Sequence, residues 1–413
     1  MLDIRKIAEL PEAHKRDCGK PTGIGGAANR HGKERHMQIT GGWVYDPDEG
    51  FAERTVCTDG EKIARISTDT KRLDAAGCYV LPLLIDLHIH GYAGADAGSA
   101  DPAELERMAR ALLMQGVGAF CPTTMTLPEA RLAAVCRCTA AYCKERHPGA
   151  QVAGIHLEGP FLAPERRGSH DEALLQNPDP ELLRRLQEAG EGAVRLMTLA
   201  PELPGALPVI QMAVKQGIRV SLGHTQADYD TARAALRAGA AQCTHLLNAM
   251  TPFGHRAPGV VGAAFDVPGT MVELICDGIH VHPAMVRAMF RLFGPERVVM
   301  VSDALPPAGL PEGTYHLGSR EITVDHGRAV LSDKPETLAG SVCSLMECVR
   351  RAVSFGIPLA DAVRAASWNP ACALGMETRK GSLRPGQEAG AVLLDRETLE
   401  TRAVIARGCV VEQ

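Results

Sequence analysis

The 413-residue sequence lacks the features that would place it in a membrane or on a nucleic acid. It contains no run of about 18 apolar residues, so no transmembrane helix is expected. The first segment, MLDIRKIAELPEAHKRDCGK, has no apolar stretch followed by a small-residue cleavage site, so we predict no secretory signal. The formal net charge is −5, whereas nucleic-acid binding needs a strongly basic surface. We therefore expect neither a membrane nor a nucleic acid as a partner.

The sequence also lacks a disulfide framework. Its 13 cysteines are odd in number and scattered along the chain. Several of them, including Cys121, Cys243 and Cys276, lie in apolar stretches, where a free thiol packs as a small hydrophobic side chain. This usage is typical of a reducing compartment, and we predict a cytoplasmic protein.

The chain is expected to divide into three parts. Residues 1–36 carry many charges and little apolar periodicity, and they are predicted to be a disordered tail. Short alternating apolar runs follow Met37 and recur near the C-terminus, which indicates antiparallel strands. Because both ends share this pattern, residues 37–80 and 377–413 are predicted to form one small β-sandwich domain beside a larger domain at 81–376.

The larger domain alternates between strand and helix patterns. Its eight predicted strands are 80–90, 119–125, 151–159, 194–201, 219–225, 242–248, 271–278 and 298–304. Near-continuous apolar strands with helical patterns between them indicate an α/β fold with a parallel sheet covered on both faces, and eight such units fit a (β/α)8 TIM barrel. A doubly wound open sheet is the alternative, but no GxGxxG opens the first unit. After the eighth strand we expect an inserted hairpin at 310–335 and two helices near 341–356 and 358–374.

Polar residues lie toward the C-terminal ends of these strands, where barrel active sites assemble. They are His88, His90, Glu158, His224, His245 and Asp303. His88 and His90 are two residues apart and share one strand face, here the barrel interior. Imidazole nitrogens with a carboxylate oxygen suit Zn²⁺, with Fe²⁺ or Mn²⁺ as alternatives, and three protein ligands with an open position are typical of a catalytic site. Asp303 is predicted to be a further ligand or a general base.

Six segments carry a resemblance to known enzymes. IDLHIHG, HLEGPF, SLGHT, THLLNAM, DGIH and VSDA occur in this order. They resemble the amidohydrolase superfamily and, more narrowly, the family of N-acetylglucosamine-6-phosphate deacetylases, over roughly Met37 to the C-terminus. HLEGPF and THLLNAM are specific to the narrower family. The resemblance implies a metal-dependent hydrolase that converts N-acetyl-D-glucosamine 6-phosphate into D-glucosamine 6-phosphate and acetate, in amino-sugar catabolism or cell-wall recycling.

The resemblance also implies a metal site. Glu158, His224 and His245 match the main metal ligands of the family. His88 and His90 match a pair that only some members have, so one or two divalent ions per subunit are expected. Glu158 takes the place of the bridging lysine of the superfamily, which has no counterpart in the fourth strand.

Further residues match the reacting and substrate-binding positions of the family. Asp303 matches the acid/base that activates the metal-bound water. Arg256 matches an arginine that can come from a neighbouring subunit, which implies a homodimer. The residues matched to binding of the amino-sugar phosphate are Ser169, His170, Asn248, Ala249, His255, Arg256, His280, Leu338, Ala339 and Gly340.

Two other classes of function remain open at this stage. A deacetylase of N-acetylgalactosamine 6-phosphate, or a hydrolase of cyclic amides, would use the same barrel and the same metal site. A homologue without catalytic activity is the other alternative, but the presence of Asp303 together with all the metal ligands disfavours it.

Overall fold

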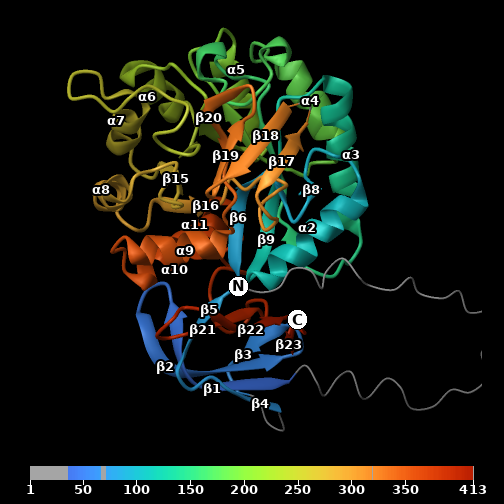
Figure 1. Ribbon diagram of the computed structural model, residues 1–413, viewed down its shortest axis with the longest axis vertical. Coiled ribbons are helices and arrows are strands. Elements are labelled where there is room, and N and C mark those ends of the chain that lie inside the picture. The colour runs from blue at the N-terminus through green and yellow to red at the C-terminus, as the bar shows by residue number, and fades with distance from the viewer. Residues whose placement is uncertain (1–35, 67–70, 319, 413) are drawn as a thin grey trace, which may run out of the picture.

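The computed structural model describes residues 36–66, 71–318 and 320–412. Residues 1–35 of the predicted tail lie outside the described residues. Figure 1 shows a barrel surrounded by helices above a smaller sheet domain, to which both ends of the described chain belong. Among the described residues, no helix is both long enough and apolar enough to cross a lipid bilayer.

Eight parallel strand positions form the barrel, which confirms the predicted fold class. Their bounds are β6 (Leu84–Ile89), β9 (Val117–Thr124), β10 (Gln151–Val152) continued by β11 (Ile155–Glu158), β12 (Val194–Leu199), β13 (Arg219–Leu222), β14 (Gln242–Cys243), β15 (Met271–Ile275) and β16 (Val298–Val301). The ring closes between its last and first strands, because the Asp303 N–H donates to the His88 carbonyl at 2.9 Å and the His90 N–H donates to the Ala304 carbonyl at 2.8 Å.

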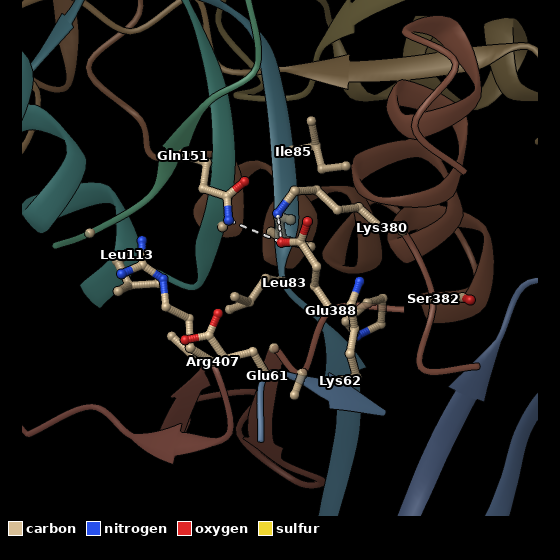
Figure 2. Close-up of a pocket in the computed structure, with 18 residues that line it drawn as sticks. Glu61, Lys62, Leu83, Ile85, Leu113, Gln151, Lys380, Ser382, Glu388 and Arg407 are labelled. Carbon is tan, nitrogen blue, oxygen red and sulfur yellow. Dashed lines mark hydrogen bonds and ion pairs between the residues drawn. The ribbon is translucent and has the colours of Figure 1, made fainter. Parts of the chain in front are cut away.

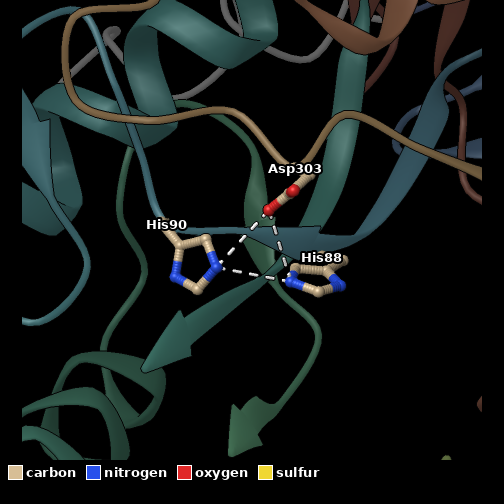
Figure 3. Close-up of side chains that lie close together, drawn as sticks. All are labelled: His88, His90 and Asp303. Atoms are coloured by element: carbon tan, nitrogen blue, oxygen red, sulfur yellow. Dashed lines mark hydrogen bonds and ion pairs between the residues drawn. The ribbon is translucent and has the colours of Figure 1, made fainter. Parts of the chain in front are cut away.

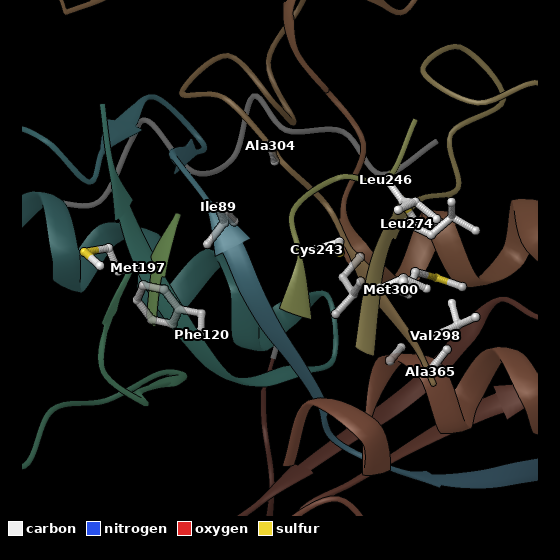
Figure 4. Packing of buried hydrophobic residues seen from close by; sticks show 14 of the residues in the cluster. Ile89, Phe120, Met197, Cys243, Leu246, Leu274, Val298, Met300, Ala304 and Ala365 are labelled. Atoms are coloured by element: carbon white, nitrogen blue, oxygen red, sulfur yellow. The ribbon is translucent and has the colours of Figure 1, made fainter. Parts of the chain in front are cut away.

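Helices cover the outside of the barrel. They are α2 (Pro102–Met114), α3 (Glu129–Lys144), α4 (Pro180–Ala189), α5 (Ala206–Lys215), α6 (Tyr229–Arg237), α7 (Gly259–Asp266), α8 (Pro283–Phe293), α9 (Leu345–Ser354), α10 (Leu359–Ala366) and α11 (Trp368–Ala373). Asp101, Asp179 and Asp228 begin three of them by accepting a hydrogen bond from a backbone N–H of the first turn. Val298 and Met300 of β16 pack beside Ala365 of α10 in the main hydrophobic core (Figure 4).

The prediction of one helix over 358–374 is wrong, because two helices, α10 and α11, meet there at Ser367. Pro370 explains the break. It has no N–H to donate to the carbonyl of Ala366, so a continuous helix would lose a hydrogen bond, whereas proline fits the first turn of a new helix.

The prediction of a hairpin at 310–335 is also incomplete. The segment forms a four-stranded antiparallel sheet of β17 (Gly313–Leu317), β18 (Arg320–Asp325), β19 (Arg328–Leu331) and β20 (Lys334–Gly340). Its inner face buries Leu317, Ile322 and Leu331 against Leu305, directly after the eighth barrel strand. Of the two strands beyond a hairpin, β20 has no alternating apolar pattern and is held by its pairing with β19.

The sheet domain takes strands from both ends of the chain. It consists of β1 (Met37–Asp46), β2 (Gly50–Asp59), β3 (Lys62–Ala64), β4 (Lys71–Asp74), β5 (Cys78–Pro82), β21 (Ala391–Asp395), β22 (Thr401–Ala406) and β23 (Cys409–Val410), connected as one sheet. The two ends join where β5 pairs antiparallel with β21. Residues 80–82, predicted to open the first barrel strand, therefore belong to β5 of this sheet. A bulge lets β1 pair with β4 and then with β5, and Gly42 is needed there because a Cβ would lie 2.6 Å from Val80.

A cavity of about 200 Å³ lies between the sheet domain and the base of the barrel (Figure 2). Its wall holds Lys380, whose side chain is 11% exposed and whose Nζ lies 2.5 Å from Glu388 Oε2. Gln151 of the barrel donates to the same oxygen at 3.0 Å, and Arg379 donates to the other at 2.9 Å. Glu388 therefore binds two cations of its own domain and is connected to the barrel by the hydrogen bond from Gln151.

Glu388→Ala is expected to lower the free energy of unfolding by about 2 kcal/mol, because it leaves the buried ammonium of Lys380 without its carboxylate. Chemical denaturation measures this loss, with the exposed Glu397→Ala of the same domain as the control. The double change Lys380→Met with Glu388→Leu removes both charges and should recover most of the stability. A single variant as stable as the control would contradict the role given to this ion pair.

Candidate active site

The strand-end residues singled out by the sequence converge at the C-terminal mouth of the barrel. All of them are buried, with exposed fractions of 7% or less. Three of them adopt a left-handed backbone conformation, with φ of 48° at His224, 27° at His245 and 50° at Asp303. Such conformations cost about 1–3 kcal/mol for residues other than glycine and are concentrated at functional sites. Here they turn the chain out of each strand and direct the side chains toward the barrel axis.

A first cluster joins the ends of β6 and β16 (Figure 3). The Nε2 atoms of His88 and His90 lie 3.3 Å apart. Asp303 Oδ1 lies 3.5 Å from the first of these nitrogens and 3.4 Å from the second. Two imidazoles and one carboxylate thus present their donor atoms to a common point.

A second cluster joins the ends of β13 and the segment after β14. The Nε2 atoms of His224 and His245 lie 3.0 Å apart. Glu158 connects both clusters, since its Oε1 is within 3.3 Å of His88, His224 and His245. Its Oε2 lies 3.0 Å from His90 Nε2.

These donor atoms fit divalent metal ions. Two ligand atoms that each lie about 2.1 Å from a tetrahedral ion are about 3.4 Å apart, close to the spacings in both clusters. Neutral imidazole nitrogens that face each other repel through their lone pairs, whereas a cation between them is bound by both. The carboxylate of Glu158 lies between the clusters, in the position of a shared ligand. The side chains present can therefore hold one ion in each cluster.

Glu158 stays charged in this environment. Burial alone would raise its pKa, but the electrostatic interactions with His88 and His224 and the hydrogen bond from His170 lower the pKa well below its ordinary value. Burial lowers the pKa of His170 to about 4, so its ring is neutral. Since His170 Nδ1 accepts the Thr126 N–H at 3.1 Å, its proton is on Nε2 and points at Glu158 Oε2, 3.3 Å away. His170 therefore orients the carboxylate in addition to lining the cleft.

The clusters open into a cleft of about 620 Å³. Eight of the residues predicted to bind substrate line it: Ser169, His170, Asn248, Ala249, His280, Leu338, Ala339 and Gly340. Ser169 Oγ donates to the Ala339 carbonyl at 3.3 Å and joins the loop after β11 to β20. The small sheet inserted after β16 thus forms one wall of the cleft, and Arg166, Arg167 and Lys334 at the same cleft were not predicted.

His255 and Arg256 do not reach this cleft within their own chain. Both are exposed on the loop between β14 and α7. The structure separates them from the other residues predicted to bind substrate.

Two carboxylates of β15 and its C-terminal end were missed by sequence reasoning. Asp277 Oδ2 lies 2.7 Å from His280 Nδ1, which leaves Nε2 as the nitrogen available to the cleft. Glu273 Oε2 lies 3.0 Å from His88 Nδ1, on the side of the ring that faces away from the cluster. The sequence did carry a signal for Glu273. An acidic side chain inside the apolar strand MVELICDG is costly to bury without a partner, so a partner could have been expected.

Gly340 is required at its position beside Asp303. It has φ of +148°, and a Cβ there would lie 2.8 Å from Leu305 Cδ2 and 3.0 Å from the carbonyl oxygen of Asp303. The Ser341 N–H donates to that same carbonyl at 2.8 Å.

Gly340→Ala is expected to lower kcat at least tenfold by displacing Asp303, since small misplacements at a reacting centre have large effects on rate. Gly313→Ala is the matched control, because Gly313 has nearly the same φ, +153°, in the same small sheet, but a Cβ there would make only an ordinary contact, 3.8 Å from Tyr315 Cε2. Steady-state rates of both variants test this expectation. Equal rates in the two variants would contradict the requirement for glycine beside Asp303.

The comparisons with known proteins agree with this geometry. The family model described as Amidohydrolase family matches residues 79–413. A Bos taurus protein named N-acetylglucosamine-6-phosphate deacetylase is 37% identical over 388 residues, covering 91% of each chain. An Escherichia coli O157:H7 protein named N-acetylgalactosamine-6-phosphate deacetylase is 36% identical over 364 residues, covering 88% of this chain and 94% of the relative.

Solved structures match over nearly the whole length. A mutant N-acetyl-D-glucosamine-6-phosphate deacetylase from Mycobacterium smegmatis, in complex with N-acetyl-D-glucosamine-6-phosphate, has a TM-score of 0.86 and 33% sequence identity. The match covers 92% of this chain and 100% of that chain.

Proposed function

The chain belongs to the amidohydrolase family and is a metal-dependent hydrolase, and from this premise we propose that it deacetylates N-acetyl-D-glucosamine 6-phosphate. The products are D-glucosamine 6-phosphate and acetate. The observation that carries the proposal is the position of Asp303, whose carboxylate lies 3.4 Å from His90 Nε2 at the floor of the cleft. Relatives that carry the name of this enzyme support the choice of substrate.

The chain's own residues account for the proton transfers. Divalent ions at the two clusters would polarise the amide carbonyl and acidify water. Asp303 accepts the proton of the attacking water and returns it to the amide nitrogen, because an amine leaves only after protonation. Burial disfavours a charged His280 ring, but the hydrogen bond and charge of Asp277 outweigh burial and raise the pKa of His280 above its ordinary value. The ring protonated on both nitrogens donates from Nε2 a hydrogen bond to the negative oxygen that develops on the substrate.

Zn²⁺ is the expected ion, with Fe²⁺ and Mn²⁺ as alternatives, because imidazole and carboxylate are donors suited to all three. Two ions per subunit are proposed, since both clusters are built in this chain and Glu158 lies between them.

The reducing cytoplasm is the proposed location, in keeping with free cysteines that are mostly buried.

The phosphate end of the substrate is assigned to the wall of the cleft around Asn248 and Ala249. His255 and Arg256 would add positive charge from a second subunit, because neither lines the cleft of its own chain. A homodimer is therefore part of the proposal. Ser169, Leu338, Ala339 and Gly340 on the opposite wall enclose the acetyl end.

The galacto epimer is the second candidate substrate, because one of the relatives carries the name of an N-acetylgalactosamine-6-phosphate deacetylase. Comparing kcat/KM for N-acetylglucosamine 6-phosphate, N-acetylgalactosamine 6-phosphate and unphosphorylated N-acetylglucosamine tests the assignment. The proposal predicts the highest value for the first and the lowest for the unphosphorylated sugar. A preference for the galacto epimer would replace the substrate and keep the chemistry.

A further inference from the structure

Glu273 occupies an unusual position beneath the two clusters. It lies on β15 inside the barrel and is fully buried, yet it does not line the cleft. Its Oε2 accepts a hydrogen bond from His88 Nδ1 at 3.0 Å and another from the backbone N–H of His245 at 3.2 Å. Its Oε1 accepts one from Gln242 Nε2 at 2.6 Å. The carboxylate thus contacts one member of each cluster.

A chain of hydrogen bonds holds Glu273 in place. Gln242 Oε1 accepts from Arg219 Nε at 2.7 Å, and Arg219 in turn donates to the carbonyl of Ala241 at 2.9 Å. Because the guanidinium can only donate, Gln242 must direct its oxygen to Arg219 and its amide N–H to Glu273. The direction of every hydrogen bond in this chain is therefore determined.

That direction determines the tautomer of His88. A charged carboxylate can only accept, so His88 Nδ1 carries the proton, and in the neutral ring that binds a cation Nε2 presents its lone pair to His90, Glu158 and Asp303. The other histidines of the clusters have no such carboxylate behind them. His224 Nδ1 lies 2.7 Å from the carbonyl of Arg166, and within the described part of the chain the Nδ1 atoms of His90 and His245 have no hydrogen-bond partner.

We propose that Glu273 is a positioning residue that controls whether an ion binds at His88 and His90. It does so by fixing the metal-binding tautomer of His88 and by tying the backbone of His245 to the same carboxylate. This inference rests on the two-ion site of the proposed function. It adds a residue outside the ligand set, together with Gln242 and Arg219, as the support of one of the two ions.

Glu273→Gln tests the inference with little change in shape. The NH2 end of the introduced glutamine must face either the side-chain N–H of Gln242 or the Nδ1–H of His88. In either orientation one hydrogen-bond donor meets another donor. Relief requires His88 to move its proton to Nε2, where it blocks the ion. We expect the bound metal to fall from two ions to one per subunit, with affinity for the weaker ion reduced about 10–100-fold.

Metal content provides the readout that does not depend on activity. The purified holoenzyme is stripped, titrated with Co²⁺, and followed by its visible absorption and by elemental analysis. Thr198→Val is the matched control. Thr198 is equally buried inside the barrel and contacts His156 at 2.8 Å and Thr244 at 2.7 Å, but it has no hydrogen bond to Glu273. This control is expected to bind two ions.

An exchange of the two side chains provides the rescue. In the double variant Glu273→Gln with Gln242→Glu, the new carboxylate at 242 accepts from both Arg219 and the new amide at 273. The amide oxygen at 273 then accepts from His88 Nδ1 again. We expect the second ion to return, which a purely structural effect of the single change would not produce.

Each outcome decides the matter. The inference is overturned if Glu273→Gln binds two ions with wild-type affinity. It is also overturned if the double variant does not regain the second ion, or if the wild-type protein binds only one ion. If the single variant does not fold, Gln242→Met removes one support of Glu273 and must weaken the same ion selectively. Two ions in the wild type without amine release would refute the proposed substrate and leave the role of Glu273 intact.

Discussion

Asp303→Asn is expected to lower kcat for deacetylation about a thousandfold, within the range that general acid–base catalysis contributes. The amide has nearly the shape of the carboxylate, but it cannot take the proton from water or return it to the leaving amine. Because Asp303 Oδ1 also lies 3.5 Å from His88 Nε2, the change is expected to weaken one ion as well. Rates are therefore measured at saturating metal, so that the remaining loss reports proton transfer alone.

The control for this prediction is Asp325→Asn, an exposed aspartate on β18 of the inserted sheet. It should keep the wild-type rate. If the protein with Asp303→Asn held its ions and turned over within tenfold of the wild type, the assignment of Asp303 as the acid/base would be refuted.

Glu158→Gln is expected to abolish both metal binding and activity. This carboxylate is within 3.3 Å of five histidine nitrogens, and its negative charge favours cations at both clusters. Loss of a direct ligand should weaken binding by more than the roughly hundredfold upper range seen for residues that only orient ligands. Elemental analysis after dialysis measures the loss of both ions, and amine release measures the loss of turnover.

Glu165→Gln provides the comparison, since Glu165 lies at the same cleft but is exposed. It should retain both ions and most of the activity. Two ions retained by Glu158→Gln would show that the two clusters bind metal without a shared carboxylate, and the bridging role would have to be abandoned.

The barrel and its ligands were predictable because both depend on local patterns. Buried parallel strands are apolar on both faces, and β9 is buried at all eight positions. Polar residues at the ends of such strands meet at one rim of a barrel wherever the intervening helices lie. His88, Glu158, His224 and Asp303 could therefore be brought together before any distances were known.

The inserted sheet and the helix break show where the local pattern was insufficient. The segment of β20 reads KPETLAG, without the alternation of a half-buried strand, and it forms a strand because β19 offers an edge. Pro370 was a readable signal for the start of α11, but the apolar pattern on both sides favoured one helix. Tertiary pairing and a single missing N–H decided these two cases.

The missed carboxylate Glu273 illustrates a different limit. Its partner His88 is 185 residues away in the sequence, so no spacing connects them. Only the barrel places β15 and β6 around the same interior. Similarly, His255 and Arg256 lie outside the cleft of the single chain, and the role proposed for them involves a second copy.

The most direct test of the central claim is to identify the products formed by the metal-replete protein from N-acetylglucosamine 6-phosphate. Proton NMR follows free acetate while a colorimetric assay follows the primary amine, and the metal-free protein serves as the blank. The account predicts acetate and D-glucosamine 6-phosphate in equal amounts, formed only when metal is bound. Protein that holds its ions and yet releases neither product would contradict it.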